Sequence, residues 1–196
     1  MANYTLTLTT QSTHRDHVTL TGAGTYPEGT TVTISATPHS GYYFYQWSKS
    51  GYGTLTNRDS ATTTFIIGAG NGSCMAYIGA YSYQISFAKT GKGTIPSSAS
   101  WECGSEHTIT ATPADGYYFD HWAVSGPGTI DDVYSATATF TVGAGVATVT
   151  AVFKPYAANY YNGNTFKKCK ALYFDGNNFV LCSMFYYDGS TWINCN

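Results

Sequence analysis

Residues 41–47 read GYYFYQW, and 75 positions later residues 116–122 read GYYFDHW. The match extends without a gap, because residues 29–70 and 104–145 are identical at 23 of 42 positions. The positions that agree carry turn glycines, a proline and large apolar side chains, with almost no acid, base or nucleophile among them. We interpret the chain as a tandem duplication that retained a scaffold rather than an active site.

Alternating polar and apolar residues dominate both copies, and no segment has the apolar spacing of an amphipathic helix. Val32, Ile34 and Ala36 fall on one face of a predicted strand, with threonine and serine on the other. We therefore expect an all-β fold in which two sheets pack face to face and helix is essentially absent. The strands predicted for the first copy are Tyr4–Thr9, His17–Thr21, Thr31–Thr37, Tyr43–Ser48, Thr54–Thr56, Thr62–Ile67 and Cys74–Ala80.

The two copies differ in length near their beginnings. Tyr4 to Gly29 spans four residues more than the matching stretch from Tyr83 to Gly104. We expect these extra residues to form a hairpin over 11–16.

Three regions follow from these patterns: a small β-sandwich-like, Ig-like first repeat over residues 1–81, a second repeat over 82–156, and a tail over 157–196. In the tail a glycine recurs at a constant spacing, at Gly163, Gly176 and Gly189, each time after Asn or Asp. Such dipeptides between strand-forming residues are a strong hairpin signal, since glycine accepts the positive φ of the turn. The tail is therefore expected to form three β-hairpins.

The tail carries more apolar side chains than a region of its size can bury alone. Those predicted to drive assembly are Phe166, Phe174, Phe179, Phe185 and Trp192. Closed symmetric association would remove them from water, so we expect a homo-oligomer, with a trimer favoured by the threefold repeat.

Cysteines recur in the tail at the same spacing as the glycines, at Cys169, Cys182 and Cys195. Three thiolates could form part of a zinc site, but the tail has neither a CxxC spacing nor a histidine. Small buried apolar residues, or a disulfide formed after cell lysis, are the preferred alternatives. We expect no metal and no cofactor. Because Cys74 and Cys103 have no cysteine partner at the matching positions, we expect free thiols.

Composition and charge restrict the possible partners. Only 10% of the 196 residues are charged and the net charge is -2, so no basic stripe is available for nucleic acid. No segment approaches the roughly 20 apolar residues that cross a bilayer. The first residues lead directly into an alternating strand, without the pattern of a signal peptide. We expect a protein made in a bacterial cytoplasm, with no nucleic acid partner and no membrane insertion.

Few polar residues are candidates for an active site. His14-Arg15-Asp16-His17 lies in the stretch specific to the first copy, and Asp120-His121 matches Tyr45-Gln46, so neither group was retained through duplication. We expect no catalytic residues. The aromatic residues Phe44, Trp47, Phe119 and Trp122 could stack on sugars, but we expect them to fill the cores.

Adjacent tyrosines offer a better contact surface. Side chains of neighbouring strand residues point to opposite faces, so one tyrosine of each pair should be exposed. Tyrosine gives a large contact area at a low entropic cost. The residues predicted to contact a glycan or protein partner are Tyr42, Tyr43, Tyr117 and Tyr118.

The residues quoted above resemble a known family. The first copy contains Tyr26-Pro27-Glu28-Gly29, then VTISATP at residues 32–38, then the stretch ending at Trp47. This pattern is similar to the divergent internalin-type B-repeat, a small all-β module of bacterial cell-surface and phage proteins. The second copy has Trp101 for the tyrosine, and residues 75–77 depart from the final strand pattern. The resemblance implies adhesion or display without catalysis.

The tail also carries a resemblance, because its aromatic, Asp-Gly repeats are similar to the ends of many phage tail, fibre and head-accessory proteins. We therefore hypothesise a non-enzymatic virion protein, a head decoration or fibre accessory, with capsid or tail subunits as partners and weak adhesion to surface glycans. The alternative is an adhesin or carbohydrate-binding module of a bacterial surface protein. A third hypothesis is an accessory domain of a hydrolase.

Overall fold

The computed structural model describes residues 2–156 and, beyond them, only the backbone of short strands between residues 158 and 194. The chain is all-β and contains two tandem β-sheet domains, which confirms the predicted fold class. Contacts divide it into two compact units, with the division after Tyr83, close to the predicted boundary after residue 81. Residues 101–105 and 142–145 group with the first unit.

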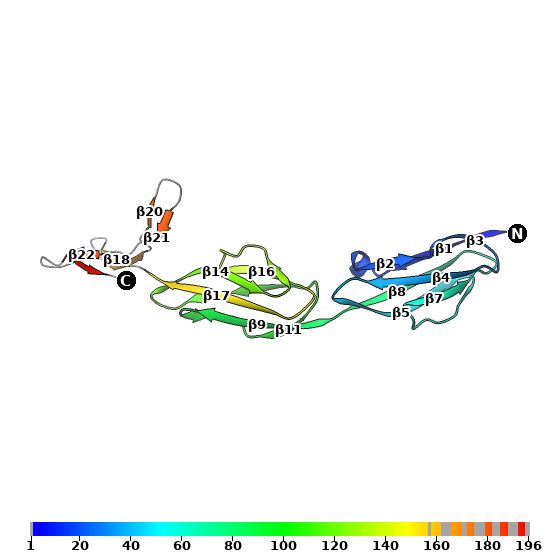
Figure 1. Cartoon of the computed structure of the whole chain (residues 1–196), viewed down its shortest axis with the longest axis horizontal. Helices are drawn as coiled ribbons and strands as arrows, with labels where there is room; N and C mark the ends of the chain where they lie inside the picture. Colours follow the sequence, from blue (N-terminus) through cyan, green and yellow to red (C-terminus); the bar gives the residue numbers. More distant parts are fainter. Residues whose placement is uncertain are drawn as a thin grey trace. The chain divides into compact units, whose positions relative to one another are not determined.

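The first repeat consists of two four-stranded sheets (Figure 1). One has the order β3-β1-β8-β5, formed by Gly24–Pro27, Asn3–Thr10, Gly72–Ala80 and Tyr42–Gly51. The other has the order β2-β4-β7-β6, formed by Val18–Thr21, Thr31–Pro38, Thr62–Ile66 and Thr54–Leu55. Strands β1 and β8 run parallel, while the other paired strands of this repeat run antiparallel.

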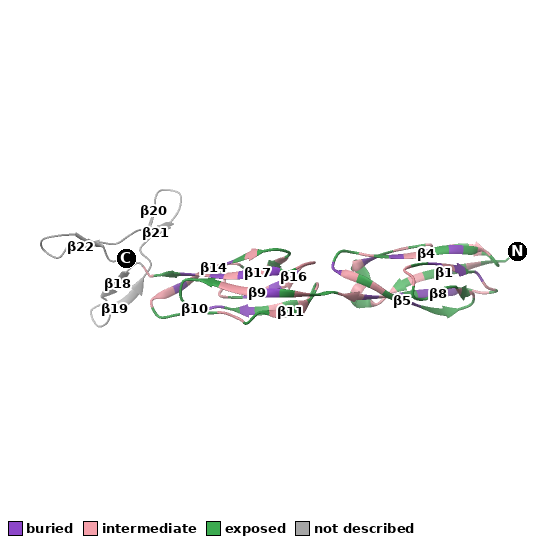
Figure 2. Ribbon diagram, turned by 60° about the horizontal axis from the view of Figure 1, so that its bottom comes forward, coloured by how far each residue is buried: buried purple, intermediate pink, exposed green. Residues whose placement is uncertain are grey.

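The core of the first repeat lies between these two sheets. Buried and exposed residues alternate along the strands, as Figure 2 shows for β4 and β8. The first sheet contributes Leu6, Trp47, Cys74, Ala76 and Ile78, and the second contributes Val18, Val32, Ile34, Ala36 and Phe65. The predicted burial of Val32, Ile34 and Ala36 is therefore confirmed. Both sheets share one apolar layer, which is the sandwich arrangement expected from the alternation.

In the first third of this repeat one prediction was wrong, and one strand was not predicted. Residues Ser12–His17 form a short 3-10 helix, η1, rather than a hairpin, and its first turn is closed by the His14 amide bonding to the Gln11 carbonyl. This polar segment has no alternating apolar residues that would hold it in a sheet. The strand β3 was missed because it contains Gly24 and Pro27, which weaken the strand signal, and its position at a sheet edge tolerates the proline.

The second repeat has a similar arrangement, but its second sheet has three strands instead of four, and a separate two-stranded pair is present. One sheet has the order β11-β9-β17-β14, formed by Ala99–Glu102, Ser82–Thr90, Ala147–Pro155 and Tyr117–Ser125. The other has the order β12-β16-β15, formed by Glu106–Thr110, Thr137–Val142 and Gly128–Ile130. A short pair joins β10 (Gly93–Thr94) to β13 (Thr112–Pro113).

The register of the two repeats confirms that they are copies. Strands β9 and β17 run parallel, as β1 and β8 do. The pairing of β5 with β8 shifts between Phe44 and Gln46, and that of β14 with β17 shifts at the matching place, between Phe119 and His121. A retained β-bulge indicates that the duplication preserved backbone geometry as well as residue types.

The tail contains three antiparallel strand pairs. They are β18 with β19 (Ala158–Tyr161 and Phe166–Cys169), β20 with β21 (Leu172–Phe174 and Phe179–Leu181), and β22 with β23 (Phe185–Tyr187 and Trp192–Asn194). The predicted turns, the thiols of Cys169, Cys182 and Cys195, and the side chains predicted to drive assembly lie outside the described residues.

Candidate functional site

A tryptophan marks the same place in both repeats. Trp47 and Trp122 are only 1% and 2% exposed. The indole N–H of Trp47 donates to the Ser60 carbonyl at 3.1 Å, and that of Trp122 donates to the Ser135 carbonyl at 3.0 Å. We call this arrangement the tryptophan corner. The prediction that these rings fill the cores is confirmed, and their polar group is already bonded within the protein.

The backbone around the tryptophan corner is held in the same way in both copies. The Trp47 amide donates to the Arg58 carbonyl at 2.7 Å, and the Trp122 amide donates to the Val133 carbonyl at 2.8 Å. Phe44 and Phe119 are half-buried, with ring centroids 5.6 Å and 5.4 Å from those of the tryptophans. The corner is therefore structural, although the side chain beside it changes from Arg58 to valine.

The tyrosine pair of the first repeat is divided between core and surface. Tyr43 is 38% exposed and packs at 4.9 Å from Tyr81. Tyr42 is half-buried, and its ring stacks on His17 at a centroid distance of 4.1 Å. Burial, together with the neighbouring Cys103 thiol, raises the pKa of Tyr42. Its role as a contact residue stays a prediction, as does that of Tyr43.

The tyrosine pair of the second repeat is less accessible. Tyr118 is only 7% exposed and lies 5.4 Å from the Tyr156 ring, and burial raises its pKa. Tyr118 is thus a core residue, and its predicted role as a contact residue is corrected. Tyr117 is half-buried, with the Lys92 ammonium 5.9 Å above its ring, and remains a predicted contact.

Asp120 and His121 belong to an ion-pair group at the edge of the second repeat. Asp120 Oδ2 lies 2.9 Å from both His121 Nδ1 and Lys154 Nζ. Partial burial raises the pKa of Asp120, but hydrogen bonds from Lys154 and His121 outweigh it, so the pKa is lowered from 3.8. The sequence did not point to Lys154, whose counterpart in the first repeat is Gly79.

The remaining titratable groups form no evident centre. Among the residues that the structure describes, no three His, Cys, Asp or Glu side chains are grouped as metal ligands would be. Cys74 and Cys103 are free thiols. Cys74 is fully buried in the core, and burial raises its pKa to about 11, which keeps it protonated and unreactive at neutral pH.

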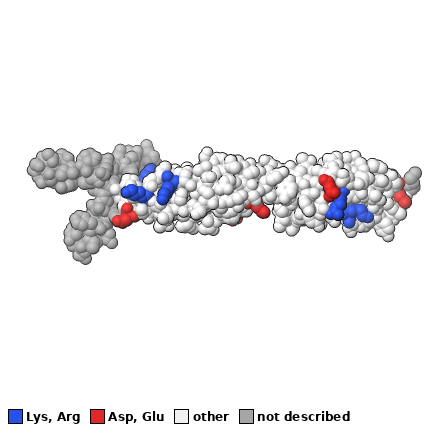
Figure 3. Space-filling view, turned by 90° about the horizontal axis from the view of Figure 1, so that it is seen from below, with Lys and Arg blue, Asp and Glu red and all other residues white. Residues whose placement is uncertain are grey.

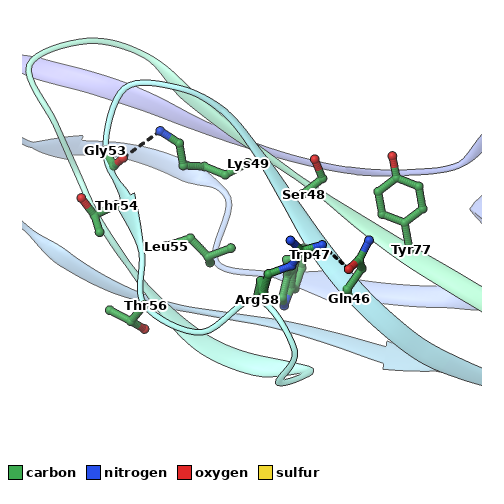
Figure 4. A pocket seen from close by; sticks show the side chains of 10 residues that line it. All are labelled: Gln46, Trp47, Ser48, Lys49, Gly53, Thr54, Leu55, Thr56, Arg58 and Tyr77. Carbon is green, nitrogen blue, oxygen red and sulfur yellow. Dashed lines mark hydrogen bonds between the residues drawn. The ribbon is translucent and has the colours of Figure 1, made fainter.

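A polar groove beside the tryptophan corner is the main cavity of interest in the first repeat. Its volume is about 670 Å³. Figure 4 shows the side chains that line it, which come from β5, β6, β8 and the loops next to β6. They are Gln46, Trp47, Ser48, Lys49, Gly53, Thr54, Leu55, Thr56, Arg58 and Tyr77. Among them, the sequence alone points only to Trp47, as a core residue.

Two cations hold the walls of this groove. Lys49 Nζ donates to the carbonyl oxygens of Gly51 at 2.7 Å and Gly53 at 2.9 Å. Arg58 donates through Nη2 to the Gln46 side-chain oxygen, and its Nε lies 3.7 Å from Asp59. Charged groups are sparse on the face of the molecule that Figure 3 draws. Lys49 and Arg58 therefore belong to a chain with few other charged side chains.

Comparison with known proteins defines the family. Residues 5–77 and 83–157 each match the model of the divergent InlB B-repeat domain. The chain belongs to this family. The resemblance found in the sequence is thereby confirmed for both repeats, while the tail beyond residue 157 lies outside the match. No curated protein matches the chain.

One solved structure matches most of the length of the chain. It contains domains 3–4 of the Streptococcal High Identity Repeats in Tandem (SHIRT) from a cell surface protein. The identity is 14%, and the match covers 79% of this chain and 99% of that chain. The TM-score is 0.21, so no argument rests on this likeness. Among the described residues, no helix is long and apolar enough to span a membrane.

The groove distinguishes the two B-repeats. At the positions of Ser48, Lys49, Thr56, Arg58 and Tyr77, the second B-repeat has Ala123, Val124, Asp131, Val133 and Val152. These differences were visible in the sequence, because they interrupt an otherwise close match. Their convergence on one groove was not visible, since Tyr77 comes from β8 while Arg58 comes from the loop after β6.

Proposed function

We propose that this chain is a non-enzymatic display protein in which two B-repeats present a binding surface on a bacterial cell. The observation that carries the proposal is what the duplication retained. The tryptophan corner, with its two carbonyl bonds, is the same in both copies. The charged groups, including Lys49, Arg58 and Asp120, occur in only one copy. Repetition of a scaffold with variable side chains suits spacing and contact better than chemistry.

Membership of the B-repeat family supports this reading, because the family resemblance implies adhesion or display rather than catalysis. Tandem modules also place any weak contact at a high effective concentration when several chains share a surface. The partner in this role is a surface glycan or a protein on a neighbouring cell.

A second candidate is a virion protein, favoured by the tail with its evenly spaced glycines. In this role the tail would bind capsid or tail subunits, with a homotrimer as the assembling form, and the B-repeats would face outward. The aromatic and Asp-Gly residues of the tail support this candidate, and the B-repeats are compatible with both.

The location of the protein distinguishes the two candidates. An antibody against residues 1–156 is applied to intact producing cells and to purified phage particles from the same culture. The proposal expects labelling of cell envelopes and no stoichiometric band in particles. Stoichiometric protein in particles with unlabelled envelopes would contradict the cell-surface role and establish the second candidate.

A further inference from the structure

We propose that the polar groove of the first B-repeat binds a saccharide that carries a carboxylate group. The inference goes beyond display, because it names a site and a ligand class. It can also be tested on the purified chain in solution, wherever the chain is located. The site comprises the ten residues that line the groove, and its specificity comes from Lys49 and Arg58.

Lys49 and Arg58 would bind the negatively charged carboxylate of the ligand. An ammonium has three donors, and Lys49 uses two of them on the carbonyls of Gly51 and Gly53. A guanidinium has five, and Arg58 binds the Gln46 side chain while lying beside Asp59. Each cation is thus oriented by the protein and keeps donors for a ligand. Charge-assisted bonds of this kind are stronger than bonds between neutral groups.

The rest of the lining suits a ligand rich in hydroxyl groups. Ser48, Thr54, Thr56 and Tyr77 contribute hydroxyls, and Gln46 contributes an amide. Leu55 is the aliphatic residue of the lining, and Trp47 is buried. No aspartate or glutamate is among the ten lining residues, and the acid beside the groove, Asp59, lies 3.7 Å from Arg58 Nε. The volume of about 670 Å³ falls within the range of small-molecule sites.

Other ligand classes fit the groove less well. A peptide added as a strand needs free backbone groups along an edge, but the Trp47 amide of β5 is already bonded to the Arg58 carbonyl at 2.7 Å. A partner protein that inserts an apolar side chain would contact little apolar surface in the groove apart from Leu55. A nucleic acid backbone needs a longer run of cations than these two.

The second B-repeat supplies the matched variants. It has valines, Val124 and Val133, at the positions of Lys49 and Arg58 on the same backbone. The double variant Lys49→Val/Arg58→Val therefore installs residues that this fold accepts. Arg58 is 60% exposed, so Arg58→Val alone serves if the double variant does not fold. Lys89→Val is the control, because Lys89 also caps a carbonyl, that of Gly93, and lies outside the groove.

The probes are trigalacturonate, the neutral trisaccharide galactotriose and the acidic peptide triglutamate, titrated into the full chain and followed by calorimetry and by amide chemical shifts. We expect trigalacturonate to bind at least about tenfold more tightly than either other probe. The double variant should lose at least about tenfold in affinity, and Lys89→Val should stay within about twofold of the parent chain. Amide shifts should move at β5, β6 and the loop before β7.

Four results would overturn the proposal. Equal binding of galactotriose would remove the role of the carboxylate, and equal binding of triglutamate would remove the saccharide. Absence of trigalacturonate binding, or unchanged binding by a folded Lys49→Val/Arg58→Val or Arg58→Val variant, would remove the groove as the site.

Discussion

The two B-repeats agree at the tryptophan corner and differ in the groove beside it. Trp47 and Trp122 make the same two bonds to carbonyls at matching positions, and the bond lengths of the two copies nearly coincide. At one of those positions, however, the charged Arg58 has Val133 as its counterpart. The carbonyl of this position is structural, whereas its side chain is free to vary. A duplicated scaffold can therefore gain a binding surface in one copy without loss of packing.

The first test of this comparison replaces the shared tryptophans. Trp47→Ala and Trp122→Ala should each destabilise their repeat by about 3 to 5 kcal/mol, because each removes a buried ring and leaves a cavity. Urea unfolding of the full chain, followed by amide signals from each repeat, measures the two effects separately. A loss below about 1 kcal/mol in one repeat would show that the two corners are not equivalent.

The second test concerns shared glycines next to the corner. Gly53 and Gly128 have φ values of +100° and +137°, and a Cβ at either would overlap the ring of Phe65 or Phe140. Gly53→Ala and Gly128→Ala should each cost about 2 kcal/mol or more, through backbone strain and overlap. Gly29→Ala is the control, since φ is +79° with open space around it.

For Gly29→Ala only the strain of the left-handed backbone remains, so we expect a loss of about 1 kcal/mol. Thermal unfolding of the three variants ranks the effects. An equal loss at all three positions would show that the overlap with Phe65 and Phe140 contributes nothing.

The third test uses an ion pair that only the second B-repeat has. Asp120→Asn removes the contact with Lys154 and should destabilise that repeat at pH 7 by a few tenths of a kcal/mol, since Lys154 is 47% exposed and solvent screens the pair. The pKa of Asp120 is lowered in the folded state, so its contribution is present above the ordinary value of 3.8 and is lost as pH falls through the lowered pKa.

The difference in stability between the parent chain and Asp120→Asn should therefore shrink from about pH 5 downward. Unfolding curves at a series of pH values measure it, with Tyr45→Asn at the matching position of the first B-repeat as the control. A difference that grows as the pH falls below about 5 would contradict the assigned direction of the pKa shift.

The smallest effect on stability is expected from removal of the tail. Each B-repeat has its own core, so fragment 1–156 should show β-type circular dichroism and a cooperative melt at the temperature of the full chain. Light scattering should show oligomers of the full chain and monomers of the fragment. Non-cooperative melting would contradict the proposed boundary at residue 156. Monomers in both samples would contradict assembly through the tail and direct attention to the stretch before Gly29.

The sequence predicted those features that depend on local pattern. All seven strands that alternation predicted in the first repeat are present in the structure. The duplicated tryptophan correctly identified a large buried side chain in the core of each repeat. The edge strand β3 and the helix η1 escaped prediction, because their glycine, proline and polar residues carry no periodic signal. The burial of Tyr118 depends on packing against Tyr156, which alternation along one strand does not report.

The groove required the structure for a similar reason. Lys49, Arg58 and Tyr77 come from two strands and a loop, and their proximity depends on how the sheets pack. The sequence did carry one signal, because Lys49 and Arg58 both match valines in the second copy. Positions where duplicated copies differ in charge are therefore the positions for which we propose a binding role.

The most direct test of the central claim is to move the groove from one B-repeat to the other. The variant combines Lys49→Val and Arg58→Val with His121→Gln, Val124→Lys, Asp131→Thr and Val133→Arg, which removes the two cations from the first B-repeat and places the matching groove residues in the second. Trigalacturonate is titrated while amide shifts of both B-repeats are recorded. If the scaffold is shared and the lining alone confers binding, the shifts should move from β5 and β6 to β14 and β15. Shifts that stay in the first B-repeat would contradict the account.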